Sequence, residues 1–245
     1  MTDQDLDSPW QTKLHARLHD PAEKALVLLR DPAGHEGGSS RALHRLLGYP
    51  RLDVKTLDPD NADVLHAALF HKGIPAPIYE TVRRADWWAA AADRPQWPME
   101  EISITTRQGE HRTLKVADAA QVRWTKKPVL IHPLTGKEFD LSRSGGLGDT
   151  DLDDLKPRSF EHFADLVQRT GEGSPDWRRT LLAYWRFGPE LREEEDNGKL
   201  GLLWPLLPAD TRVPDHSIWD HLDLTSAFAG AFAADAEGEV ALLTM

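Results

Sequence analysis

An apolar helical pattern that stops at an adjacent histidine and aspartate constrains the fold of this chain most. Trp10, Leu14 and Leu18 recur every four residues, so they are expected to share one buried face of a helix. Pro21 suits the start of a new segment, which places His19-Asp20 where that helix stops. One imidazole nitrogen and one carboxylate oxygen at this point can bind the same cation. Because His-Asp pairs also occur by chance, the interpretation depends on further ligands elsewhere in the chain.

The absence of cysteine from the 245 residues limits the chemistry of any metal site. Disulfides, thiolate zinc sites and cysteine nucleophiles are excluded. A metal must therefore be held by His, Asp and Glu, a ligand set that suits Mn, Fe, Co, Ni or Mg better than structural zinc.

The formal net charge of -11 argues against a free-standing nucleic-acid binder, which needs a basic face. A nuclease stays compatible with this charge, because bound cations offset carboxylates locally and partner subunits can hold the strand. No apolar run approaches the length of a bilayer span, and the acidic start lacks the pattern of a secretory signal. We therefore expect a cytoplasmic protein with no membrane partner.

The pattern along the chain predicts a mainly α fold with a small β-hairpin insertion. Residues 1–99 form the first helical part, 100–145 a β-rich insertion and 146–245 a second helical part. Within the insertion, residues 102–106 and 113–116 flank Gln108-Gly109-Glu110 as the strands of a hairpin, and residues 128–137 read as a further strand and turn. The length allows one large domain or two small ones.

Two further segments offer inward-facing ligands. Asp86 lies in an alanine and tryptophan setting that should be largely buried, where an unpaired carboxylate is costly, so a basic side chain or a metal should pair with it. His221 falls one turn into a helix for which Ser217 is the expected N-cap, and its apolar neighbours predict that it points toward the body. His35 is a fourth candidate that can fold back on His19-Asp20; the alternative is an exposed loop histidine.

Two imidazoles and two carboxylates suit one or two divalent cations. A metal lowers the pKa of water toward neutrality, and paired metals can clamp both oxygens of a displacement at phosphorus. Phosphodiester hydrolysis is the reaction that this set would serve best.

Four stretches, in the same order, resemble the N-terminal HD domain of the large, Palm-containing subunit of type III CRISPR interference complexes, Cmr subtype (type III-B). They are residues 18–25, 85–94, 132–136 and 207–227. The resemblance implies a circularly permuted HD-type helical domain, in which the helix that carries the first histidine of an ordinary HD domain comes last in the chain.

The resemblance also assigns roles to residues. His221 corresponds to the first histidine, His19-Asp20 to the catalytic and metal-binding doublet, Asp86 to the closing aspartate and His35 to the intermediate histidine. The neighbours expected to orient ligands or bind a second metal are Asp215, His216 and Asp220. Lys24 or Arg94 would contact the phosphate, and the alternative for each is an ordinary surface salt bridge.

The leading hypothesis is a metal-dependent nuclease domain that cuts single-stranded DNA in an antiviral effector. Its partners would be other subunits of the CRISPR ribonucleoprotein and, indirectly, the guide and target RNA. The Gly-Gly-Asp-Asp motif of the family's Palm domain is absent from this sequence, so synthesis of cyclic oligoadenylate is not expected. The alternatives are a silent assembly module that docks on partner subunits or guide RNA, with nine tryptophans and the hairpin as its surface, and a hydrolase of small nucleotides.

Overall fold

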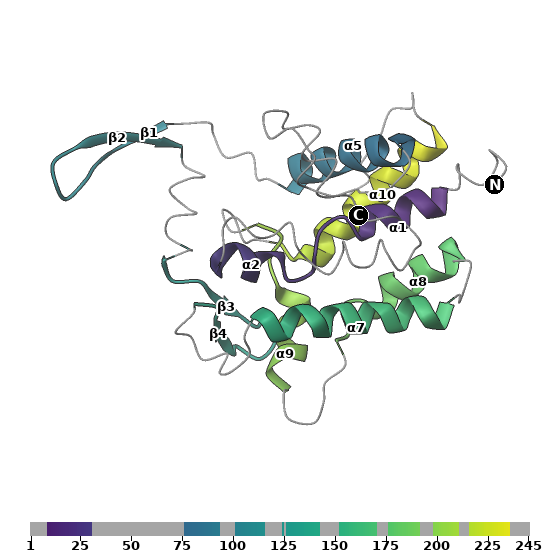
Figure 1. Cartoon of the computed structure of the whole chain (residues 1–245). Helices are drawn as coiled ribbons and strands as arrows, with labels where there is room; N and C mark the ends of the chain where they lie inside the picture. The colour runs from purple at the N-terminus through teal and green to yellow at the C-terminus, as the bar shows by residue number, and fades with distance from the viewer. Residues whose placement is uncertain are drawn as a thin grey trace, which may run out of the picture.

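The computed structural model describes residues 9–30, 76–93, 101–115, 124, 126–142, 152–170, 176–191, 198–210 and 216–235. These form a mainly α fold with two small antiparallel strand pairs, as predicted (Figure 1). The helices are α1 (Pro9–Arg17), α2 (Lys24–Arg30), α5 (Ala76–Asp93), α7 (Leu152–Thr170), α8 (Trp177–Phe187), α9 (Gly198–Leu203), the short 3-10 helix η4 (Trp204–Leu206) and α10 (Ile218–Ala234).

Helices α1, α5 and α10 pack together through small and aromatic side chains (Figure 1). Ala85 and Ala89 of α5 are fully buried and allow its backbone to approach α10 closely. The remaining members of this apolar cluster are Ala16, Ile78, Val82, Phe228, Ala229 and Phe232. The first and last parts of the chain therefore meet in one helical body.

A larger apolar cluster joins the other face of α1 to α7, α8 and η4. Trp204 and Tyr184 are its largest fully buried side chains. The Trp204 indole donates a hydrogen bond to the carbonyl oxygen of Gly188 at 3.0 Å, and the Trp219 indole donates to that of Trp204 at 3.1 Å. Both buried indole N–H groups thus find acceptors, as burial of a tryptophan requires.

The predicted burial of tryptophans on α1 and α5 is wrong. Leu14 and Leu18 are buried as expected, but Trp10 is 37% exposed and lies under the guanidinium of Arg178 at 5.2 Å. Trp87 and Trp88 of α5 are likewise 57% and 44% exposed. Ala85 and Ala89 take core-facing positions in this part of α5, so Trp87 and Trp88 are left partly exposed to solvent.

The β-rich insertion contains two hairpins. Strand β1 (Glu101–Thr105) pairs antiparallel with β2 (His111–Lys115), as predicted, and β3 (Val129–Ile131) pairs with β4 (Glu138–Asp140), a strand that the sequence pattern missed. Gly109 and Gly136 adopt φ of +83° and +67° at the turns, which glycine tolerates without a Cβ penalty. The β1–β2 hairpin projects from the helical body (Figure 1), whereas Phe139 of β4 is buried in the larger cluster.

The stretch expected to be helical after the insertion contains α7, α8, α9 and α10. Helix α8 begins after the N-cap Asp176, whose carboxylate accepts a hydrogen bond from the amide of Arg179 at 3.0 Å. None of the helices in the described part of the chain has the length and hydropathy that a bilayer crossing requires. The division into residues 1–99, 100–145 and 146–245 stays a prediction.

Candidate metal centre

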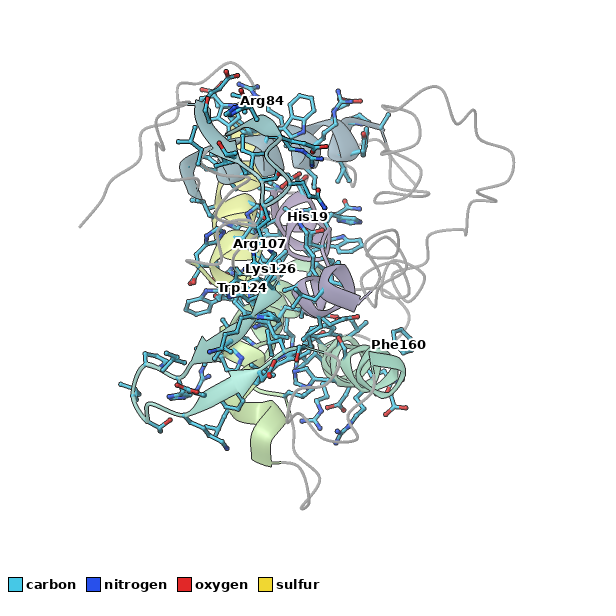
Figure 2. All side chains as sticks on the ribbon, turned by 90° about the vertical axis from the view of Figure 1, so that its left-hand side faces the viewer. His19, Arg84, Arg107, Trp124, Lys126 and Phe160 are labelled. Carbon is cyan, nitrogen blue, oxygen red and sulfur yellow. The ribbon has the colours of Figure 1, made fainter. Side chains whose placement is uncertain are left out.

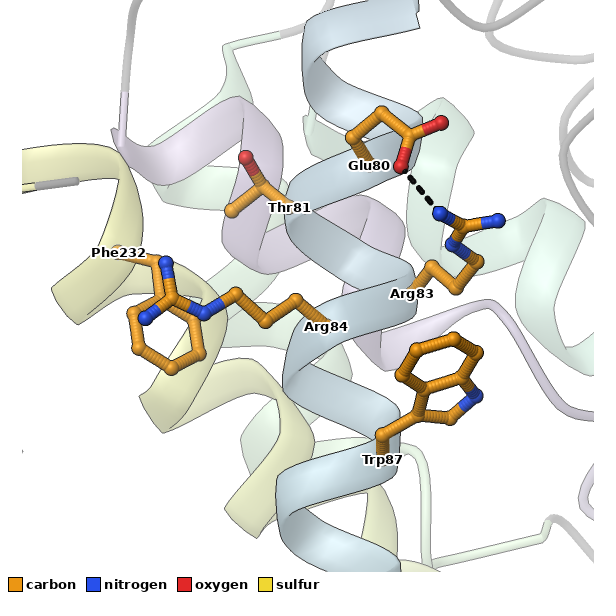
Figure 3. A pocket seen from close by; sticks show the side chains of 6 residues that line it. All are labelled: Glu80, Thr81, Arg83, Arg84, Trp87 and Phe232. Atoms are coloured by element: carbon orange, nitrogen blue, oxygen red, sulfur yellow. Dashed lines mark hydrogen bonds and ion pairs between the residues drawn. The ribbon is translucent and has the colours of Figure 1, made fainter.

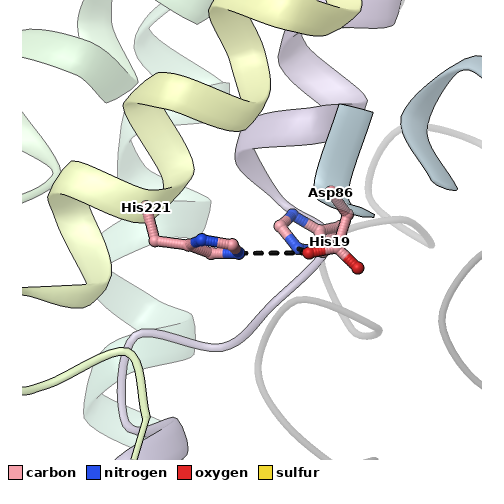
Figure 4. A group of neighbouring side chains, drawn as sticks. All are labelled: His19, Asp86 and His221. Atoms are coloured by element: carbon pink, nitrogen blue, oxygen red, sulfur yellow. Dashed lines mark hydrogen bonds and ion pairs between the residues drawn. The ribbon is translucent and has the colours of Figure 1, made fainter. Parts of the chain in front are cut away.

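Three elements bring the predicted ligands together. His19 lies in the turn directly after α1, Asp86 in α5 and His221 in the first turn of α10. Their candidate ligand atoms all lie within 4.8 Å of one another. Figure 4 shows the three side chains pointing toward one another from separate segments. The cluster predicted from the sequence thus includes these three residues.

The capping box at the start of α10 fixes the position of His221. Ser217 is the N-cap, as predicted: its hydroxyl accepts from the amide of Asp220 at 3.1 Å, while the Ser217 amide donates to Asp220 Oδ2 at 3.1 Å. These two hydrogen bonds give acceptors to two backbone N–H groups that have no partner within the helix at its N-terminus. Because the helix starts at a defined residue, His221 faces the body, and its Nε2 lies 3.2 Å from Asp86 Oδ1.

A backbone carbonyl sets the tautomer of His19. Its Nδ1 lies 2.6 Å from the carbonyl oxygen of Ala16, which can only accept, so Nδ1 carries the proton. Nε2 then presents a lone pair toward Asp86 Oδ1 and Asp20 Oδ2, each 3.4 Å away. This buried nitrogen makes no hydrogen bond to any described residue. A buried acceptor without a donor, beside carboxylate oxygens, fits a cation.

Asp20 is held by a lysine. Lys24 Nζ lies 2.6 Å from Asp20 Oδ2, and the Asp20 side chain is only 4% exposed. Burial would raise the pKa of this carboxyl, but Lys24 and His19 outweigh burial and lower the pKa to about 2. Burial would lower the pKa of Lys24, but Asp20 outweighs it and raises that pKa above its ordinary value. Both groups are therefore charged at neutral pH, in a partly buried pair rather than an ordinary surface salt bridge.

Asp86 is held by the two imidazoles. Burial would raise the pKa of its carboxyl, but the neighbouring imidazoles of His19 and His221 outweigh burial and hold the pKa far below its usual range. The expected partner of Asp86 was a basic side chain or a metal, and the side chains that the structure places beside its Oδ1 are the imidazoles of His19 and His221. Its side chain is 22% exposed, against 4% for His19 and 6% for His221. Of these three described residues, Asp86 is therefore the one that solvent reaches most readily.

The remaining predicted site residues lie less close to these ligands or outside the described residues. The ring of His216 lies 6.4 Å from that of His221, centroid to centroid. Asp220 is exposed and caps α10. His35, Asp215 and Arg94 lie outside the described residues.

The pairing of Lys24 with Asp20 is the contribution that the sequence analysis missed. Asp20 lies outside both helices, in the connection between α1 and α2, and Lys24 is the first residue of α2, so the pair depends on how this connection turns. Pro21 correctly indicated that no continuous helix joins the two residues, and the sequence pattern alone did not specify the turn that brings them together.

The sequence is similar to two known proteins. No protein-family model matches the sequence, and no solved structure gives a significant match. The chain is 33% identical over 243 aligned residues to CRISPR system Cmr subunit Cmr2 of Pyrococcus furiosus, covering 89% of this chain and 24% of that protein. It is also 36% identical over 93 residues to chorismate synthase of Chlorobium limicola, covering 35% of this chain and 23% of that protein.

The two matches differ in the share of this chain that they cover. The Cmr2 match runs through most of it, whereas the chorismate synthase match leaves about two thirds of it unaligned. The chain spans about a quarter of the length of Cmr2. By sequence, then, this chain is related to Cmr2 over most of its own length.

Proposed function

We propose that this chain is an HD-type, metal-dependent phosphodiesterase domain of a type III-B CRISPR effector large subunit, and that it cuts single-stranded DNA. The observation that carries the proposal is the meeting of His19, Asp86 and His221, with a buried imidazole nitrogen that has no hydrogen-bond partner among the described residues. Three segments far apart in sequence would have no packing reason to bring two buried imidazoles and a partly buried carboxylate against one another.

The order of the ligands along the chain supports a permuted HD arrangement. His19-Asp20 comes first, Asp86 follows, and His221 comes from the last described helix. This is the order that the resemblance implies when the helix bearing the first histidine is moved to the end. The relationship to Cmr2 supports the same assignment and the expectation of partner subunits, guide RNA and target RNA.

The residues present fit one divalent cation held by His19, Asp86 and His221, with Mn, Ni, Co, Fe or Mg as candidates. With both imidazoles neutral, Asp20, Asp86 and Lys24 leave one net negative charge. One cation more than offsets that charge, and the ammonium of Lys24 would repel a second one beside Asp20. We therefore favour a single ion, with Lys24 as the second positive charge of the site.

Such a cation, when bound, lowers the pKa of water toward neutrality and offsets charge on a phosphodiester. The chain's own residues prepare the site for this chemistry. Ala16 fixes the His19 tautomer through its carbonyl, the capping box fixes His221, and Asp20 holds the ammonium of Lys24. Lys24 is thereby kept protonated beside the centre, where it can contact a phosphate oxygen.

A silent assembly module is the second candidate. The exposed β1–β2 hairpin, with Ile102 and Ile104 on its surface, and the exposed Trp87, Trp88 and Trp185 favour a role in docking. Such a module needs no metal, which separates it from the nuclease.

Cleavage of labelled single-stranded DNA tests the proposal. Purified full-length chain is incubated with Mn, Ni, Co or Mg and compared with His19→Ala/Asp20→Ala and with the surface control His111→Ala. The proposal expects metal-dependent cutting by the wild type and the control and at least a hundredfold less by the double variant, a typical scale for loss of metal-centre chemistry. Absence of cutting with every metal, or equal cutting by the double variant, favours the assembly module.

A further inference from the structure

We propose that strand β1 pairs edge to edge with β1 of a second copy of this chain, so that the two hairpins form one continuous four-stranded sheet. The inference goes beyond the proposed function, because the hairpin contributes none of the candidate metal ligands. The open main-chain edge of β1, the symmetry of its sequence and the exposure of its side chains each support it.

The β1–β2 hairpin stands away from the helical body and is open to solvent. Figure 1 shows it projecting from the helices, and Figure 2 views the molecule from the side to which it projects, with Arg107 of the turn labelled. Every residue of β1 is exposed, and Ile102 and Ile104 are 37% and 36% exposed. A two-stranded sheet alone is marginally stable in water, and further strands stabilise it. A partner strand is therefore favourable at this hairpin.

One edge of β1 offers unpaired main-chain groups. The amide of Thr106 donates to the carbonyl oxygen of Glu110 at 2.8 Å, and this pair continues the register of β1 and β2. Bonded and non-bonded pairs alternate along an antiparallel ladder, so the main-chain groups that point away from β2 are those of Glu101, Ser103 and Thr105. None of these groups bonds to main chain elsewhere in the described residues. They form a row of amides and carbonyls that another strand can meet.

The open edge of β1 lacks the features by which proteins prevent such pairing. Exposed edges are commonly blocked by proline, lysine or a β-bulge. Strand β1 has the sequence Glu-Ile-Ser-Ile-Thr, with its single charge at one end, and it pairs with β2 without a bulge. Strand β2 carries Arg112 and Lys115, so it is the more strongly charged strand of the hairpin. Pairing is therefore favoured at β1.

The sequence of β1 is complementary to itself in the antiparallel direction. When Ser103 lies opposite its counterpart on a two-fold axis, Ile102 lies opposite Ile104 of the second copy, and Glu101 lies opposite Thr105. The isoleucine pairs then share one face, and cross-strand pairs of β-branched side chains stabilise a sheet. In this register the outward main-chain groups of the two copies meet and can bond reciprocally. No charged side chain of β1 faces a like charge.

The local charge allows two copies to approach each other. The formal charge of the whole chain is -11, which opposes self-association in general. The hairpin, residues 101–115, contains three basic and two acidic residues, so the copies would meet at a part of the chain that is not acidic. Salt screens the remaining charges over about 8 Å under physiological conditions. A two-fold contact uses the same edge on both copies, so the assembly closes as a dimer.

Charge substitutions at Ser103 test the register as well as the association. Sedimentation equilibrium of the full chain in EDTA, from about 1 μM to about 1 mM, covers the range in which small interfaces associate. We expect a monomer–dimer equilibrium for the wild type. Ser103→Lys and Ser103→Glu should each weaken the dimer about tenfold, because like charges then stand one strand spacing apart, about 5 Å. An equal mixture of these two variants should recover a dimer, since the charges on the two-fold axis are then opposite.

Thr113→Lys is the matched control. Thr113 lies directly opposite Ser103 in the hairpin and shares its face, but it belongs to β2. In the dimer the two new lysines would stand about three strand spacings apart, about 14 Å, where salt screens their repulsion. Trp87→Lys is a second control, at an exposed tryptophan of α5 beside the ion pair of Arg83 with Glu80 (Figure 3). Both variants should dimerise as the wild type does, and thermal unfolding checks that every variant is folded.

Several outcomes overturn the inference. They are a wild type that stays monomeric over the whole concentration range, a Ser103→Lys dimer as stable as that of the wild type, a mixture of the two Ser103 variants that stays monomeric, and an equal loss of the dimer in Thr113→Lys. A monomeric wild type that pairs through β1 with a strand of another protein makes this edge a docking site for that protein instead. The measurement needs no metal, so its result is independent of whether the chain cuts DNA.

Discussion

At the scale of single residues, the ring of His19 is oriented by main chain rather than by another side chain. The Ala16 carbonyl belongs to the last turn of α1, so the helix end itself selects the Nδ1–H tautomer. A proton on Nδ1 leaves Nε2 as the only ligand atom, directed at Asp86. The orientation of this imidazole therefore depends on α1 ending at Arg17 and the chain turning there.

Removal of the Lys24 charge should leave the buried Asp20 carboxylate without its ion-pair partner and so destabilise the folded protein. We expect Lys24→Met to lower the free energy of unfolding by about 3 kcal/mol, the lower end for a broken buried pair, because Lys24 is 21% exposed. Urea unfolding in EDTA measures this. Lys24→Met/Asp20→Asn should recover most of the loss, since no unpaired charge then remains; equal stability of the single and double variants would contradict the account.

His15 should make stability depend on pH between about 6.5 and 4. Its side chain is fully buried, and burial lowers its pKa from 6.5 to about 4. Between these values the unfolded chain binds a proton that the folded chain excludes, so stability falls as pH drops from about 6.5 to 4. The change is up to about 3 kcal/mol.

The slope of unfolding free energy against pH in this window checks the prediction for His15. His15→Gln lowers stability at every pH but should flatten the slope between pH 6.5 and 4. The exposed His111→Ala should leave the slope as it is. A wild-type slope unchanged by His15→Gln would show that the proton is taken up elsewhere.

At the scale of elements, the start of α10 links helix stability to the metal centre. Ser217→Ala removes the hydroxyl that accepts from Asp220, and should cost about 1 kcal/mol. Because His221 lies in the same turn, its affinity for metal should fall as well. Asp176→Ala removes the corresponding cap of α8 and is the matched control, with a similar loss of stability. Equal metal affinity in both variants would contradict a positioning role for the cap.

Sequence periodicity predicted the elements better than the faces that they bury. The β1–β2 hairpin forms where the pattern placed it, and α10 begins after Ser217, its expected N-cap. The exposure of Trp87 was not predictable, because the choice between alanine and tryptophan as the core face depends on how closely α10 approaches. The strand β4 was missed for a related reason: a three-residue strand is specified by its partner β3 more than by its own pattern.

At the scale of the whole molecule, the candidate site depends on the complete tertiary fold. Asp86 and His221, which share the hydrogen bond at the centre, are 135 residues apart in sequence. Glu23, fully buried, accepts a hydrogen bond from Ser159 at 3.0 Å and so ties the segment after His19-Asp20 to α7. The identities of His19, Asp20, Asp86 and His221 could be proposed from motif and resemblance, but their convergence and the role of Lys24 required the packing of α1, α5 and α10.

Metal binding by the full chain tests the central claim most directly. Calorimetric titration of the EDTA-treated and desalted protein with Mn²⁺ should give about one ion per chain. Asp86→Asn and His221→Gln should each lower the affinity at least about tenfold, while His111→Ala should not change it. Lack of binding by the folded wild type, or equal affinity in the Asp86→Asn and His221→Gln variants, would contradict a metal centre formed by His19, Asp86 and His221.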